Sequence, residues 1–315
     1  MTGEKHQPAG WDPNDSAPRG EAMMPRRRFW LWLSLAAVGL AACTRNERAA
    51  EGEGKPETGF GPSVETEYAV GAYVARIYDT TANNNPGRFE ILHHGKSVLW
   101  RSGFRFYLET QSAAGKANQG DLGTSITGDG IPTLVMKEWT GGAHCCFRLH
   151  LFALGPTLRS IQTIDVDDNE VTEFENLDAD SALELTVRDM AFAYWKTSFA
   201  ASPAPRVVLK FRDGQYHIAP ELMRRLPPPA EKITEMAKEY FGDVSWREGT
   251  NPPVDLWGDM LELLYTGNAR EAWALLGEAW PPGVPGKEDF RSEFTEKLKT
   301  SRYWPELNAR FAFAK

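Results

Sequence analysis

Oxygen-bearing side chains at alternate positions form the clearest candidate binding site in this sequence. Asn176, Asp178, Asp180 and Glu184 share one short segment and are spaced as the first, third, fifth and ninth residues of a loop. A hard cation such as Ca²⁺ takes six to eight oxygen ligands, which alternate residues of a tight loop can supply together. The spacing therefore predicts a calcium site. The alternative is an Asx-rich turn whose side chains cap their own backbone.

A second segment, residues 125–133, has the same spacing, but hydroxyl groups stand in place of most carboxylates. We expect it to keep the loop geometry without metal, because fewer carboxylates mean less charge for a hard ion. Both segments resemble the calcium loops of FG-GAP and integrin-type repeats. That family has glycine where this chain has Ser181, a difference that we expect to strain the turn.

The string Gly-Gly-Ala-His144-Cys145-Cys146 is the second candidate for chemistry. It resembles a segment of uncharacterised bacterial exported proteins that carry the same flanking loops. Three interpretations compete: a strained disulfide between the adjacent cysteines, two unpaired buried thiols, or a soft-metal site with His144. The disulfide is favoured outside the cytoplasm. The metal site needs a further ligand such as Met136 or His150.

No established catalytic motif is present in the sequence, so we expect a protein that is not an enzyme. The pair His93-His94 is interpreted as a hairpin tip, and the carboxylate run over residues 165–170 as a solvated turn. The alternative is a hydrolase or redox enzyme that uses the His144-Cys145-Cys146 segment. A pocket with perturbed titratable groups at this segment would favour the enzyme, and dry burial would favour a structural role.

An export signal precedes the folded part of the chain. Arg26, Arg27 and Arg28 are followed by an apolar run that ends in Leu40-Ala-Ala-Cys43. The run is shorter than the ~20 residues of a spanning helix. The Leu-Ala-Ala-Cys string resembles the lipobox of bacterial lipoproteins. This resemblance implies cleavage before Cys43 and its modification by acyl chains such as palmitate, which would anchor the protein stably.

The segments around the signal are polar. Residues 1–22 are proline-containing and predicted to be disordered, and a start at Met23 or Met24 would give a signal peptide over 23–42 of ordinary length. Residues 43–62 carry almost no apolar side chains and are predicted to be a flexible tether. We expect the protein to face the periplasm of a cell envelope from the outer membrane.

The composition excludes one class of partner. The chain has 35 basic and 43 acidic residues, for a net charge of −8, and lacks a basic stripe. This balance argues against nucleic acid and leaves the membrane and an envelope protein as expected partners.

The rest of the chain changes its hydrophobic period once. Residues 63–226 contain alternating segments rich in β-branched and aromatic residues, with a hairpin at Asp213-Gly214. After Pro227-Pro228-Pro229 the period becomes helical, over 230–241, 256–264, 269–276, 289–300 and 305–313. We expect an α+β protein: an antiparallel β domain (a sandwich or partial propeller-like sheet) followed by a small helical domain over 227–315. A closed propeller of about four or more blades would not fit the length.

These observations predict a membrane-anchored envelope lipoprotein with a binding or structural role. The resemblance of residues 176–184 adds the expectation that calcium stabilises it.

Overall fold

The computed structural model describes residues 63–78, 86–108, 123–142, 146–169, 172–241, 243, 245–248 and 251–313. The predicted signal peptide, the predicted lipidation site Cys43 and the predicted tether lie outside the described residues, as do His144 and Cys145. Within the described residues, none of the helices combines the length and apolarity that crossing a membrane requires.

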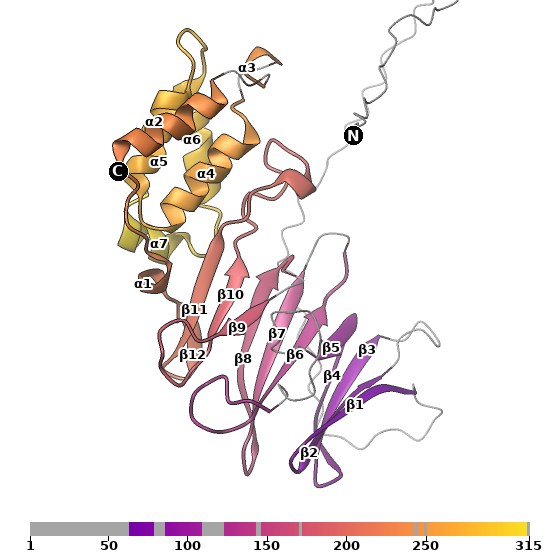
Figure 1. Cartoon of the computed structure of the whole chain (residues 1–315). Helices are drawn as coiled ribbons and strands as arrows, with labels where there is room; N and C mark the ends of the chain where they lie inside the picture. The colour runs from indigo at the N-terminus through magenta and orange to yellow at the C-terminus, as the bar shows by residue number, and fades with distance from the viewer. Residues whose placement is uncertain are drawn as a thin grey trace, which may run out of the picture. The chain divides into compact units, whose positions relative to one another are not determined.

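The β region consists of three four-stranded antiparallel sheets (Figure 1). The first contains β1 (Val64–Val70), β2 (Tyr73–Tyr78), β3 (Gly87–His93) and β4 (Lys96–Gly103). The second contains β5 (Arg105–Leu108), β6 (Thr133–Trp139), β7 (Phe147–Leu154) and β8 (Leu158–Asp167). The third contains β9 (Glu173–Glu175), β10 (Glu184–Arg188), β11 (Arg206–Arg212) and β12 (Gln215–Ile218).

In every sheet the strands lie side by side in chain order. This repeated meander is the strand pattern of a propeller blade. The predicted hairpins have the expected turn residues: His94-Gly95 joins β3 to β4 and Asp213-Gly214 joins β11 to β12, all with positive φ. The α+β prediction with an antiparallel β region is confirmed.

Helices follow the last strand (Figure 1). The bounds are α1 (Pro220–Met223), α2 (Ala230–Tyr240), α3 (Ser245–Glu248), α4 (Val254–Tyr265), α5 (Ala269–Ala279), α6 (Lys287–Leu298) and α7 (Trp304–Phe311). The periodicity of the sequence predicted five of these helices, and the short α1 and α3 were missed because a single turn has no period to detect. A further short 3₁₀ turn, Phe199–Ala201, lies between β10 and β11.

Two apolar clusters hold these elements together. The smaller one lies between the first two sheets, where the Phe89 ring contacts Phe106 at 4.9 Å between ring centroids. The larger one runs from the second sheet through the third and into the helices, so that Leu149, Leu185 and Trp257 belong to one cluster. The helical segment therefore packs on the sheets, and the segments that meet there position the candidate site described below.

Candidate functional site

The two loops with calcium-type spacing occupy equivalent places in successive sheets. Residues 125–132 lead into β6, the second strand of its sheet, and residues 176–183 lead into β10, the second strand of the next. The loops also contact each other, because the Leu183 N–H donates to the carbonyl of Ile126 at 2.9 Å. The Tyr216 hydroxyl donates to both of these residues, to Ile126 O at 3.2 Å and to Leu183 O at 2.9 Å. The loops thus form one packed unit.

The structure brings three of the four predicted calcium ligands together. Carboxylate oxygens of Asp178, Asp180 and Glu184 lie within 4.8 Å of one another. The ammonium group of Lys210, on β11, lies among them. It donates to Asp178 and, at 2.6 Å, to Asp180 Oδ2, and it lies 3.6 Å from Glu184 Oε1. The hydrogen bonds to Asp178 and Asp180 raise the pKa of Lys210, and the bond from Lys210 lowers the pKa of Asp180.

The fourth predicted ligand, Asn176, serves the backbone of the loop. Its Oδ1 accepts the Ala179 N–H at 2.6 Å, and its Nδ2 donates to the Asp180 carbonyl at 2.5 Å. The left-handed position of the turn is Ala179, with φ of 63°, whereas Ser181 has no positive φ. The expectation of strain at Ser181 was therefore wrong, because the turn places its left-handed residue two positions earlier.

Asp129 occupies the centre of the second loop. Its Oδ1 accepts hydrogen bonds from Ser125 Oγ at 3.1 Å, Thr127 Oγ1 at 2.9 Å and the Ile131 N–H at 2.9 Å. Partial burial raises the pKa of Asp129, but these hydrogen bonds outweigh it and leave the pKa below its ordinary value. Two of the three hydrogen bonds to Asp129 Oδ1 come from side chains of the same loop, so this loop closes on its own polar groups.

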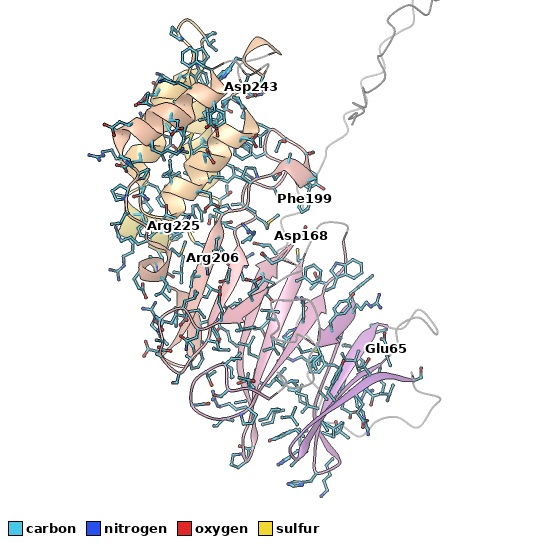
Figure 2. The ribbon with its side chains drawn as sticks, viewed as in Figure 1. Glu65, Asp168, Phe199, Arg206, Arg225 and Asp243 are labelled. Atoms are coloured by element: carbon cyan, nitrogen blue, oxygen red, sulfur yellow. The ribbon has the colours of Figure 1, made fainter. Side chains whose placement is uncertain are left out.

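A pocket of about 310 Å³ lies where the ends of the strands meet the turn between α6 and α7. Asp168 and Phe199, both labelled in Figure 2, belong to its lining. The complete lining is Cys146, Asp167, Asp168, Asp189, Met190, Ala191, Ala193, Phe199, Thr300, Ser301 and Arg302. The lining thus combines carboxylate and hydroxyl groups with apolar side chains.

Asp167 is the most perturbed carboxyl group of this pocket. Burial raises its pKa to about 6, against the opposing charge of Arg302, and the neighbouring carboxylates of Asp165 and Asp189 raise it further. The guanidinium of Arg302 donates to Asp167 Oδ1 and, at 2.7 Å, to the Asp165 carbonyl. Asp167 also has a φ of 51°, a left-handed conformation that is unfavourable for a residue other than glycine.

Asp189 ties the pocket wall to the helices. Only 2% of its surface is exposed, and its carboxylate accepts the Tyr265 hydroxyl at 2.6 Å, the Ser301 hydroxyl and the Ala191 N–H at 2.9 Å. Tyr265 ends α4, and Ser301 lies between α6 and α7. The buried carboxylate is therefore fully hydrogen-bonded and holds three segments in place.

Cys146, the last residue of the predicted cysteine site, lines this pocket and is half-buried. The disulfide with Cys145 stays a prediction, because Cys145 lies outside the described residues. The suggested metal ligand His150 is engaged elsewhere: its ring nitrogens bond to Glu138 at 2.9 Å, Arg101 at 2.8 Å and Thr163 at 3.0 Å. Burial lowers the pKa of His150.

The interpretation of residues 165–170 as a solvated turn was wrong for Asp167 and Asp168, because both line the pocket. Sequence reasoning also missed Asp189 and Arg302. Asp189 directly follows β10, which is a weak signal, and nothing in the sequence connects Arg302 to Asp189.

Comparisons of the chain with protein-family models, with curated proteins and with solved structures found no match.

Proposed function

We propose that this protein is a lipid-anchored protein of the cell envelope, facing the periplasm, whose folded part binds a ligand in the pocket beside Asp167. The Leu40–Cys43 string supports the anchor, and the polar residues after it support a tether between membrane and folded body. The observation that carries the binding role is the pocket itself, where Asp167 has a pKa of about 6.

The charges of the pocket favour a ligand with a cationic group. Three carboxylates line it, from Asp167, Asp168 and Asp189, against the one guanidinium of Arg302. Phe199 and Met190 add apolar surface for an uncharged portion of the same ligand. An amine next to an apolar group, as in a basic peptide or an amino sugar, matches this lining.

A titration with defined probes tests the proposal. The full chain in detergent is titrated at pH 7.5 with a short lysine-containing peptide amide and with its glutamate counterpart, and binding is followed by calorimetry. We expect the basic peptide to bind and the acidic one not to. Ala193→Trp, which fills the pocket, should abolish binding, whereas Ala200→Trp, at an exposed position outside the lining, should leave it unchanged. Equal binding to wild type and Ala193→Trp would refute the proposal.

A hydrolytic enzyme is the second candidate, and the same carboxyl group favours it. A general acid works best with a pKa near the operating pH, which a value of about 6 provides for Asp167. Cys146 lies in the lining of the same pocket, the arrangement that we expected of an enzyme. This candidate predicts that the Asp167→Asn variant still binds an ester or glycoside substrate but no longer turns it over. Retained turnover in that variant would exclude Asp167 as the acid.

A further inference from the structure

We infer that Lys210 takes the place of the calcium ion that the resemblance of residues 176–184 implies, so that an ammonium group of the chain itself closes this loop. The ammonium contacts all three clustered carboxylates: Asp178, Asp180 and Glu184. It reaches them from β11, the strand that pairs with β10. The side chain of Lys210 is only 15% exposed, so it belongs to the interior of the loop.

Glu184 gives independent evidence that a cation belongs at this position. It is completely buried, and its Oε2 accepts the Leu177 N–H at 2.7 Å. Its Oε1 has no hydrogen-bond donor among the described residues and faces the Lys210 ammonium at 3.6 Å. A buried carboxylate is costly without a compensating charge. Lys210 supplies that charge, and a second cation would have to displace it.

The ligand set fits an ammonium better than it fits calcium. Ca²⁺ takes six to eight oxygens, whereas an ammonium group has three hydrogens to donate. Two go to Asp178 and Asp180, and the third can point towards Glu184. Asn176 directs its side-chain oxygen to the Ala179 N–H and lies outside the carboxylate cluster. The loop therefore stays closed at any calcium concentration, and it keeps its contact with the neighbouring loop through Leu183.

Thermal unfolding of the full chain in EDTA or in about 5 mM CaCl₂, above the Kd range of protein calcium sites, which extends to about 1 mM, tests this inference. We expect the Tm of wild type to be the same in both. Lys210→Met should have a lower Tm in EDTA, and CaCl₂ should restore it by several degrees, because the three carboxylates then have no other cation. Lys232→Met, at an exposed lysine paired with Glu235, is the control and should be insensitive to calcium.

Lys210→Gln, which keeps a hydrogen-bond donor on a side chain one atom shorter, serves if Lys210→Met does not fold without calcium. Calorimetry with CaCl₂ alone should then detect binding to Lys210→Gln and none to wild type. A calcium-dependent rise in the Tm of wild type would overturn the inference, because the metal would then share the loop with Lys210. A lack of calcium binding in both variants would overturn it as well, because the carboxylates would not form a cation site.

Discussion

Replacement of Asp167 by asparagine should change how the stability of the protein depends on pH. In the folded protein burial raises the pKa of this carboxyl group to about 6, whereas the ordinary value is 3.8. Between these two values the folded state holds a proton that the unfolded state has lost. Asp167 therefore contributes stability that is fully present below pH 3.8 and is lost as the pH rises through 6.

The magnitude follows from the two pKa values. A shift of about two units corresponds to about 3 kcal/mol, since each unit is about 1.36 kcal/mol. The Asp167 side chain is 30% exposed, so solvent screening reduces this figure to about 2 kcal/mol. The asparagine of the Asp167→Asn variant cannot titrate, and the other carboxyl groups contribute to both proteins. Their contributions cancel in the difference between wild type and Asp167→Asn.

Urea unfolding of both proteins at pH values from 4 to 7.5 measures that difference. Relative to Asp167→Asn, wild type should lose about 2 kcal/mol of unfolding free energy over this range, with the steepest change at about pH 5, midway between the two pKa values. Glu221→Gln, at an exposed carboxylate paired with Arg212, is the control and should show no such change. A difference that stays constant with pH, or one that favours wild type as the pH rises, would refute the burial argument.

Three further predictions concern the contact between the two loops, the hydrogen bonds of Asp189 and the redox state of the cysteine pair. In urea unfolding, Gly128→Ala should lower the free energy of unfolding by about 3 kcal/mol, because φ is 75° and a Cβ would lie 2.7 Å from a backbone nitrogen of the other loop. Gly130→Ala is the control: its φ is 77° but the space around it is open, so it should lower the free energy of unfolding by only about 1 kcal/mol. Tyr265→Phe should lower the free energy of unfolding in urea by about 1–2 kcal/mol, because the buried Asp189 carboxylate loses one hydrogen-bond donor. An unchanged midpoint of the urea transition would contradict this. Intact-mass measurement of the purified protein should show a gain of about 2 Da on reduction if Cys145–Cys146 is a disulfide, and an unchanged mass would exclude the bond.

Local patterns in the sequence were enough to predict the strands, the hairpins and most of the helices. Period-two alternation is conspicuous where one face of a strand is buried, as in β2, whose residues alternate between buried and half-buried. Asp213-Gly214 supplied the two positive φ values of a tight hairpin. The grouping of the strands into three separate meanders could not be predicted, because no local pattern states where one sheet ends and the next begins.

The same difference between local and long-range contacts decides which residues of the candidate sites could be predicted from the sequence. The sequence could place Asp178, Asp180 and Glu184 together because they share one loop, whose geometry brings their carboxylates close to one another. Lys210 could not be predicted, because it reaches the loop through the pairing of β10 with β11. The pocket was missed for the same reason: Asp167 and Arg302 are far apart in sequence and meet only when the helices pack on the sheets.

Photo-crosslinking in intact cells tests the central claim, a ligand-binding pocket on an envelope-anchored protein, most directly. A benzophenone amino acid is placed at Phe199, in the pocket, or at Phe241, an exposed aromatic residue at the end of α2. Our account predicts a discrete adduct in the membrane fraction at Phe199, lost when Ala193→Trp fills the pocket, and none at Phe241. Equal labelling at the two positions, or an adduct at Phe199 that survives Ala193→Trp, would contradict it.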